Sequence, residues 1–457
     1  MKNFFRKLSF SKLLLVGLII RLILLPLSYH SDLNTNAIWG IYAHEFGLRG
    51  FYDWLNFGNY ARPDYPPLAM VMFLNIRRIW EILFNFLWGL NISIPVFPSN
   101  FIPWFETKGY LSLIKLPGII ADLGISFLIY GFIKKLKGEM SAKVVASYFL
   151  FNPAVIYLSS SWGQLDSIVS FFGLGAVILI LRKRYWPSLS SYFVSIMIKA
   201  TYVPLALVLG VKALKEKIGF RKLLGLGGVL LLYLFTVGAI FYDKSFVLWT
   251  INTYINKVLP GAVTLPYLNL NAYNFWGLIL GLERIPDNTL YFGLSLKVWA
   301  WALTTIAVGL IILKFITTFK KTPTFQVGNE LNADMSSSFR GNPALQSGED
   351  VIKGKDIFFT FTVLYFALFM FMPRVHERYL YPVFVFFPLV LAILPKLKKY
   401  FFVLSGIFLL NLYHWWWFPK ISGLVYILDL DFVERGLSFL NLILFGLILK
   451  KYLLNKK

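Results

Sequence analysis

The sequence has no cysteine, few histidines and few acidic residues. Without cysteine, the chain can form neither disulfides nor thiolate sites. The four histidines stand at positions 30, 44, 376 and 414, and this spacing is not that of a zinc site. The 22 acidic residues face 45 Lys and Arg residues, which gives a formal net charge of +23. In a soluble protein, this excess of basic residues would indicate nucleic-acid binding.

Hydrophobic residues, however, make up 58% of the chain, which exceeds the share typical of soluble domains. Apolar runs of about 18 residues recur along the sequence, and such runs are typical of transmembrane helices. The basic residues fall in short clusters between these runs, as they do on the cytoplasmic side of membrane proteins. Membrane topology therefore explains the charge, and we expect a lipid bilayer rather than nucleic acid as a partner.

The apolar runs and basic clusters together predict an all-α multi-pass protein of the cell membrane. The basic N-terminal residues precede an apolar run without a small-residue cleavage site, which predicts an uncleaved first membrane helix over residues 11–28. We expect about twelve membrane segments in one domain, residues 1–457, with both termini cytoplasmic. Residues 320–355 are rich in Ser, Asn and Gly without periodicity, and they predict a flexible cytoplasmic loop.

Two segments depart from the pattern of simple spans. Residues 67–88 are apolar but carry three charged residues in their middle, and charges at the bilayer centre are costly. We therefore expect this segment to lie along the membrane surface. Residues 186–211 contain Lys199 and Pro204 between two basic flanks. This pattern predicts two short, broken helices forming a hairpin that turns near Tyr202.

Residues 31–68 form the first outer loop, which is too polar to cross a bilayer and rich in Trp, Tyr and Phe. Residues 36–54 could form an amphipathic helix in the membrane interface. Asp32 directly follows the first span and is our candidate general base, since a carboxylate can take the proton of an attacking sugar hydroxyl. Its alternatives are a helix cap and a solvated loop acid. Asp64 and Tyr65, near the end of the loop, are candidate contacts for sugar or acceptor.

Further polar residues fall on the same outer side in the expected topology. The loop with Trp162, Gln164 and Asp166 offers an indole, an amide and a carboxylate to sugar hydroxyls, although Asp166 could also cap the next helix. Arg378 presents a fork suited to phosphate oxygens, and its alternative is snorkelling at the interface. His376 and the intramembrane Lys199 are further candidates for phosphate binding.

Three other features of the sequence contain residue types that could contribute to such a site. Asn271 and Asn274 lie in an outer segment and are candidate sugar or acceptor contacts. Asp429 and Asp431 form a D-x-D pattern, but nothing metal-like surrounds it, so we expect no metal there. The three tryptophans of residues 415–417 suit an interfacial belt better than a sugar platform.

Several of these motifs resemble the glycosyltransferase C superfamily, in particular the prokaryotic relatives of the GPI-anchor mannosyltransferases. The matching pieces are DYPPL (Asp64–Leu68), KLPGIIADL (Lys115–Leu123), FNPAVIYLSSSWGQLDSI (Phe151–Ile168), IKATYVPL (Ile198–Leu205), LNAYNFWGL (Leu270–Leu278) and PRVHERYLYP (Pro373–Pro382). The resemblance implies a polyprenyl- or dolichyl-phosphate sugar donor, inverting displacement at the anomeric carbon, and no metal or other cofactor. Asp32 would correspond to the acidic residue of that family's first outer loop.

The residues and the resemblance together predict an inverting glycosyltransferase, with mannose as the expected sugar, whose active site is extracytoplasmic. The acceptor could be a glycolipid, a glycan or a protein. One rival is a flippase or transporter for lipid-linked sugar, which should show inverted repeats that are not visible in this sequence. A second rival is an outer-face oligosaccharide ligase or polymerase, which would use a pyrophosphate donor.

Overall fold

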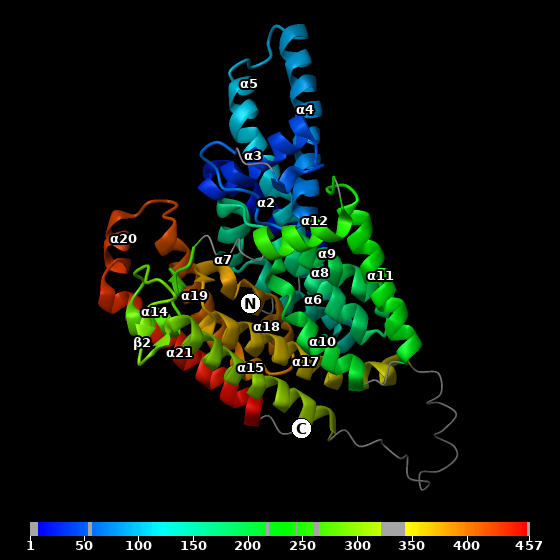
Figure 1. Ribbon diagram of the computed structural model, residues 1–457, viewed down its shortest axis with the longest axis vertical. Coiled ribbons are helices and arrows are strands. Elements are labelled where there is room, and N and C mark those ends of the chain that lie inside the picture. Colours follow the sequence, from blue (N-terminus) through cyan, green and yellow to red (C-terminus); the bar gives the residue numbers. More distant parts are fainter. Residues whose placement is uncertain are drawn as a thin grey trace.

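The computed structural model describes residues 8–53, 57–215, 219–243, 245–258, 265–320 and 343–454. This part of the chain is almost wholly helical, and its only strands are four two-residue segments (Figure 1). The all-α prediction is therefore confirmed.

The N-terminal half, up to residue 258, contains α2 (Phe10–Leu24), η1 (Leu25–Leu27), α3 (Ser31–Phe46), η2 (Phe51–Asp53), α4 (Pro67–Ser93), α5 (Phe101–Trp104), η3 (Phe105–Gly109), α6 (Tyr110–Leu150), α7 (Pro153–Ile156), η4 (Tyr157–Trp162), α8 (Asp166–Leu181), α9 (Tyr185–Ile198), η5 (Ala200–Tyr202), α10 (Leu205–Lys215), α11 (Phe220–Gly238), α12 (Phe246–Thr253) and η6 (Tyr254–Val258).

The C-terminal half contains the four strands and the remaining helices. Its elements are β1 (Asn269–Leu270), α14 (Phe275–Leu280), β2 (Leu290–Tyr291), β3 (Leu294–Ser295), α15 (Leu296–Lys320), α17 (Pro343–Phe371), β4 (Val375–His376), η7 (Glu377–Leu380), α18 (Tyr381–Leu391), η8 (Pro395–Leu397), α19 (Lys398–Trp415), α20 (Ser422–Leu428) and α21 (Asp431–Leu454). β1 pairs in parallel with β4, and β2 pairs antiparallel with β3.

Among the residues that the structure describes, four helical segments are long and apolar enough to cross a membrane: Phe10–Leu27, Phe101–Leu150, Leu296–Thr318 and Asp431–Leu454. Asp166–Leu181, Leu224–Gly238 and Asp356–Phe371 are apolar but shorter. These helices support a membrane protein, while the number of twelve segments and the orientation of the termini stay predictions. The long element α6 is bent at Gly138, whose φ of 75° interrupts the helical backbone, so it consists of two helices.

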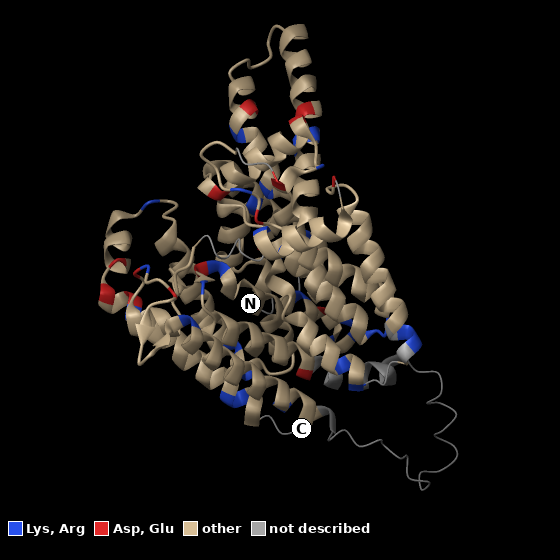
Figure 2. Cartoon of the chain, in the orientation of Figure 1, with Lys and Arg blue, Asp and Glu red and all other residues tan. Residues whose placement is uncertain are grey.

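The packed body is built around α6, α8, α17 and α18, whose inner faces are buried and apolar. Helix α8 packs on α6 and α9, while α17 packs on α15, α18 and α21. Helix α4 and the segment with α5 project from this body as a hairpin (Figure 1). Charged residues are sparse along the helices of the body and gather near the base of the hairpin and at the helix ends on the opposite edge (Figure 2).

The structure corrects or refines three predicted segments. Residues 343–355 belong to helix α17, residues 321–342 lie outside the described part of the chain, and the flexible cytoplasmic loop over residues 320–355 stays a prediction. The predicted break near Tyr202 is present between α9 and α10. Helix α10 also packs on α15 and α17, which the hairpin prediction did not include. The first outer loop forms α3 at Ser31–Phe46 instead of a helix over residues 36–54. The surface placement of residues 67–88, now the first part of α4, stays a prediction.

Candidate active site

Charged side chains from five separate segments meet near the first turn of α3. They are Asp32, Asp64, Asp166, Lys199, Glu377 and Arg378, and we call them the Asp32 cluster. The segments are α3, the loop before α4, the start of α8, the end of α9, and η7. Five of these six residues were predicted site residues from distant parts of the sequence, and the fold brings them together.

Asp32 lies in the first turn of α3 and is held by neighbouring donors. The ring of His30 caps the helix by accepting a hydrogen bond from the Asp32 backbone N–H at 3.1 Å. The Oδ2 atom of Asp32 accepts hydrogen bonds from Gln164 Nε2 at 2.5 Å and from Trp162 Nε1 at 3.4 Å. The helix capping foreseen as an alternative for Asp32 is carried out by His30, so the Asp32 carboxylate is oriented rather than used as a cap.

The surroundings of Asp32 keep it ionised. Burial alone would raise the pKa of Asp32, but the His30 ring, the charge of Arg378 and the amide of Gln164 together hold that pKa well below its usual value. The side chain is nevertheless 38% exposed. Asp32 is therefore a charged carboxylate with fixed orientation and an open side through which a ligand can reach it.

Trp162 and Gln164, which we predicted as sugar contacts, lie behind this carboxylate. Their exposed fractions are 0% and 4%. Gly163 between them has a φ of 86°, and a Cβ at that position would lie 2.7 Å from a methyl group of Leu33 and 2.9 Å from the Lys115 stem. This tight turn aims both donors at Asp32. In this arrangement one N–H of each side chain donates to the carboxylate, and contact with a sugar stays a prediction.

Lys199 and Asp166 form a buried ion pair. Lys199 Nζ lies 2.9 Å from Asp166 Oδ2, and both side chains are largely shielded from solvent. The ammonium group also lies 5.8 Å from the ring centroids of Tyr65 and Tyr379. Asp166 Oδ1 has no hydrogen-bond partner. Asp166, predicted as a sugar contact, thus balances the charge of Lys199, which was predicted to bind phosphate.

The turn formed by β4 and η7 supplies Arg378. Its Nη1 atom donates to Glu377 Oε1 at 3.0 Å and lies 3.4 Å from His376 Nδ1. Its guanidinium carbon lies 5.9 Å from the ring centroids of Trp162 and Tyr379. Burial alone would lower the pKa of Arg378, but Glu377 and Asp32 raise it. Arg378 Nε and Glu377 Oε2 are buried without a hydrogen-bond partner, so the turn has one unused donor and one unused acceptor.

His376 is neutral near pH 7. Its burial, followed by the charge of Arg378, lowers the pKa of His376, and Glu377 only partly opposes this shift. Burial alone would raise the pKa of Glu377, but His376 and Arg378 lower it, so Glu377 is ionised. His376 can therefore hydrogen-bond to a phosphate but adds no positive charge. Glu377 was not among the predicted site residues, although its place beside Arg378 in the sequence could have indicated a charge partner.

Asn271 and Asn274 support the turn from behind. Asn271 pairs through its backbone with His376, and its carbonyl accepts a hydrogen bond from Asn411 Nδ2 at 2.6 Å. The side chain of Asn274 is fully buried. It caps α14 by accepting from the backbone N–H groups of Trp276 and Gly277, each at 3.0 Å. Because of this burial, Asn274 cannot contact a sugar in the observed arrangement.

Asp64 is the one carboxylate of the cluster whose pKa is raised, whereas those of Asp32 and Glu377 are lowered. Burial raises the pKa of Asp64 to about 6, partly opposed by a backbone hydrogen bond and the charges of Lys199 and Arg378. The neighbouring Tyr65 ring lies beside Lys199, and the Tyr65 carbonyl accepts a hydrogen bond from the Tyr52 hydroxyl at 2.6 Å. The loop with Asp64 and Tyr65 therefore lies beside Lys199, and its contact with sugar or acceptor stays a prediction.

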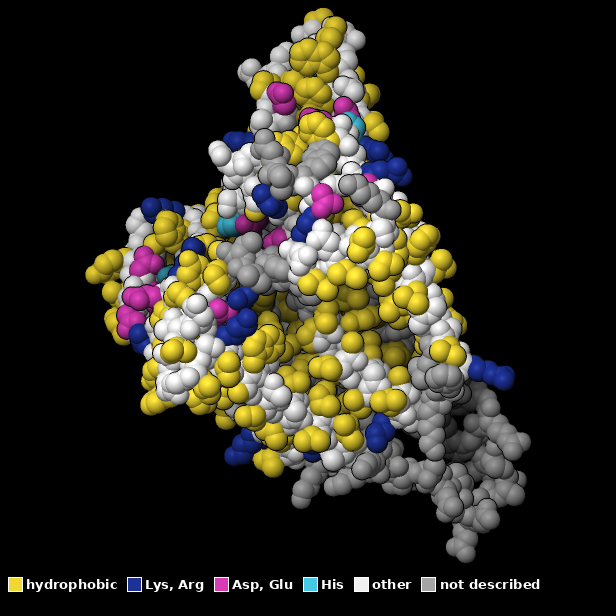
Figure 3. Space-filling view, in the orientation of Figure 1, with side chains coloured by type: hydrophobic (Ala, Val, Ile, Leu, Met, Phe, Trp, Pro, Cys, Tyr) yellow, Lys and Arg dark blue, Asp and Glu magenta, His cyan; other side chains and the backbone are white. Residues whose placement is uncertain are grey.

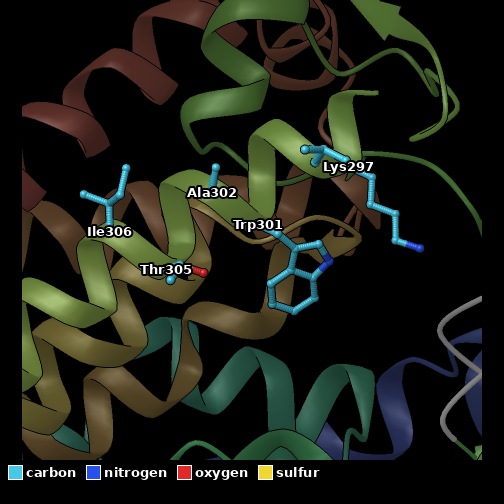
Figure 4. A pocket seen from close by; sticks show the side chains of 6 residues that line it. Lys297, Trp301, Ala302, Thr305 and Ile306 are labelled. Atoms are coloured by element: carbon cyan, nitrogen blue, oxygen red, sulfur yellow. The ribbon is translucent and has the colours of Figure 1, made fainter. Parts of the chain in front are cut away.

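A shallow, open apolar groove of about 740 Å³ lies along one face of α15. Its lining residues are Lys297, Val298, Trp301, Ala302, Thr305 and Ile306 (Figure 4). These positions follow the helical period, so one stripe of α15 forms the wall. The space-filling view shows hydrophobic side chains around a hollow at the centre of this face, with charged and His side chains near its upper rim (Figure 3).

The late D-x-D pattern has local partners. Asp431 accepts two hydrogen bonds from Arg435 Nε, at 2.9 and 2.8 Å. Asp429 Oδ1 lies 3.1 Å from His414 Nε2. Within the described ranges, no group of three or more His, Asp or Glu side chains could hold a metal ion.

Comparison with known proteins adds no assignment to this geometry. No protein-family model matches the chain, and no curated protein matches it. The functional argument therefore rests on the residues of the Asp32 cluster and on the groove along α15.

Proposed function

We propose that the protein is an inverting membrane glycosyltransferase that moves a sugar from a polyprenyl-phosphate donor to an acceptor hydroxyl on the outer face of the membrane. The observation that carries this proposal is the oriented, ionised and accessible carboxylate of Asp32 beside the guanidinium of Arg378. The order of the motifs around these two residues, which resembles glycosyltransferase C enzymes, supports the same reading.

In the proposed reaction, the acceptor hydroxyl attacks the anomeric carbon and Asp32 takes its proton. The bond between that carbon and the phosphate oxygen breaks, and its electron pair stays on the phosphate. Negative charge therefore grows on the leaving group, where Arg378 can stabilise it through its free Nε–H. Lys199 contributes a second positive charge, and the neutral His376 contributes a hydrogen bond.

The charge balance of the cluster favours a monophosphate over a pyrophosphate donor. Both cations are already paired, Lys199 with Asp166 and Arg378 with Glu377. Asp32 adds a further negative charge, so the cluster has no surplus positive charge. A sugar phosphodiester carries one negative charge, whereas a pyrophosphate carries more. This difference argues against the ligase or polymerase alternative.

The groove along α15 suits the lipid part of such a donor. Its wall is apolar apart from Thr305 and Lys297, and Lys297 stands at the N-terminal end of the stripe. A polyprenyl chain needs an apolar path of this kind, while its phosphate needs cations nearby. The proposal includes a multi-pass topology of about twelve segments with cytoplasmic termini and mannose as the sugar, both of which come from the sequence.

Asp64 is a second candidate for the proton acceptor. A general base works best when its pKa lies near the working pH, and burial brings the pKa of Asp64 to about 6. Two carboxylates with opposite pKa shifts commonly divide acid–base and electrostatic roles. In this variant of the mechanism, Asp64 takes the proton and Asp32 stabilises positive charge on the sugar ring.

The test is sugar release and transfer by the purified protein from radiolabelled polyprenyl-phosphate-mannose, with and without EDTA. We expect transfer that survives EDTA and gives the inverted anomer. Turnover with a glucose or arabinose donor instead would keep the enzyme class and discard mannose. Crossing of a vesicle membrane by the lipid-linked sugar without donor consumption would favour the flippase alternative and overturn the proposal.

A further inference from the structure

Lys115, in the first half of α6, is buried without a carboxylate partner. Its exposed fraction is 1%, and no ion pair to it is found within the described residues. Its Nζ atom instead donates to four backbone carbonyl oxygens, those of Leu25, Ser28, Ser160 and Ser161, at 2.5 to 3.0 Å. The ring centroid of Tyr29 lies 4.9 Å away. The ammonium group thus occupies a cage of carbonyl dipoles, as a bound monovalent cation would.

The four carbonyls belong to the two segments that meet at Asp32. Leu25 and Ser28 lie at the end of the first span, just before α3. Ser160 and Ser161 lie in η4, directly before Trp162. The Ser28 hydroxyl also donates to the Ser161 carbonyl at 3.1 Å. The Lys115 side chain therefore joins the segment that leads to Asp32 to the segment that carries Trp162 and Gln164.

The stem of Lys115 also fixes the turn between those donors. A Cβ at Gly163 would lie 2.9 Å from Lys115 Cγ, so the backbone of the turn packs directly against this side chain. An ammonium group has three N–H donors, and the four carbonyls share them. Without the ammonium, all four carbonyls would lose this donor, and only the Ser161 carbonyl has the Ser28 hydroxyl as a further donor, so the loss is costly in a low-dielectric interior.

We propose that Lys115 is a positioning residue whose ammonium group joins the two segments through their carbonyls and holds Trp162 and Gln164 on the Asp32 carboxylate. Its effect on catalysis rests on the proposed function. The residue does not touch the reacting atoms, and it acts through the two segments that it joins.

The first test is chemical rescue of Lys115→Ala in the transfer assay. We expect kcat to fall about 100-fold with KM little changed, since small displacements of catalytic groups have effects of this size. A short alkylammonium ion such as propylammonium should restore much of the loss, while sodium should not. Lys143→Ala is the matched control, because Lys143 lies in the second half of the same element α6, beyond the bend at Gly138, is largely buried and pairs with Glu139 at 3.0 Å. It should show neither the loss nor the rescue.

The second test does not depend on activity. Hydrogen exchange measured by mass spectrometry should be faster in Lys115→Ala for residues 28–33 and 158–165 together, and propylammonium should slow it again. Unchanged exchange in these segments, or a rise spread over the whole chain without rescue, would overturn the proposal. If Lys115→Ala does not fold, Lys115→Arg should fold with a local rise in exchange limited to the same segments. A wild-type protein without turnover would contradict the proposed function, and the exchange result would still decide the role of Lys115.

Discussion

Two groups of buried charge within the described residues differ in access. In the first, Arg21 of α2 pairs with Asp122 of α6 at 2.9 Å, and both side chains are fully buried. Arg21 Nη1 also donates to the Gly17 and Leu150 carbonyls, and the Tyr381 hydroxyl donates to Asp122 at 2.8 Å. The second is the Asp32 cluster, in which the central carboxylate is 38% exposed.

The comparison teaches that buried charge alone does not identify a functional site. The Arg21–Asp122 pair joins α2 to α6 and is closed to solvent, with one guanidinium nitrogen left without a partner. The Asp32 cluster leaves polar atoms of Asp166, Glu377 and Arg378 unpartnered and keeps an opening. A sealed pair serves stability, whereas an open cluster with spare hydrogen-bonding capacity suits a ligand. Substitutions in the two clusters should therefore have opposite consequences.

The largest effect on activity is expected from Asp32→Asn. The change removes the proton acceptor while keeping the size of the side chain, so transfer should fall by about 10²–10⁴-fold. Thermal unfolding in detergent should change little, because the side chain is partly exposed. Full transfer activity in a folded Asp32→Asn protein would remove Asp32 from the role of base and direct attention to Asp64.

The largest effect on stability is expected from Asp122→Asn. This change leaves the Arg21 guanidinium without a compensating charge in a sealed interior, which typically costs about 3–5 kcal/mol. The unfolding temperature should drop clearly, while activity per folded molecule should stay near that of the wild type. A loss of activity without loss of stability would erase the distinction between the two clusters.

A smaller loss is expected from Arg378→Lys. Lysine keeps the charge but lacks the planar fork that can donate to Glu377 and to a phosphate at once. Loss of one such donor typically lowers kcat by about 10²-fold. Arg374→Lys, in the same turn, is the control, since Arg374 pairs with Asp287 at 2.7 Å and should affect transfer far less. Equal effects of both substitutions would show that only the fold of the turn matters.

The smallest effect is expected in the pH dependence of Asp64. Because burial raises the pKa of Asp64 from 3.8 to about 6, the folded protein holds this proton more tightly than the unfolded chain. Its contribution to stability is therefore gained as pH falls through about 6 and is absent at higher pH. Asp64→Asn should raise the unfolding temperature at pH 7.5 and change it little at pH 4.5. An equal change at both pH values would contradict the shifted pKa.

The position of the site could be predicted from the sequence, but the partners within it could not. Asp32, Lys199 and Arg378 are conspicuous because each is a charge in or next to an apolar segment, and the fold brings them together. The pairing of Lys199 with Asp166, and of Gln164 with Asp32, depends on distances between distant segments. The periodicity of a sequence does not reveal which of its distant segments lie within hydrogen-bonding distance of each other.

The cap of α14 and the turn η4 are two local features that the sequence analysis did not predict. Asn274 precedes a short apolar helix and could have been recognised as its cap. The π-helical turn η4, which aims Trp162, is stabilised by the buried ammonium of Lys115. Its conformation follows from tertiary packing and has no signature in the local sequence.

The most direct test of the account is photo-crosslinking with a polyprenyl phosphate that carries a diazirine on its first isoprene unit, next to the phosphate. The account predicts labelled peptides from the turn around η7 and from the N-terminal half of α15, with labelling reduced by unlabelled polyprenyl phosphate and in Arg378→Ala. A phospholipid with the same diazirine should label the outer surface without this preference. Labelling by polyprenyl phosphate that matches the phospholipid pattern and ignores Arg378→Ala would contradict a lipid-phosphate site at the Asp32 cluster.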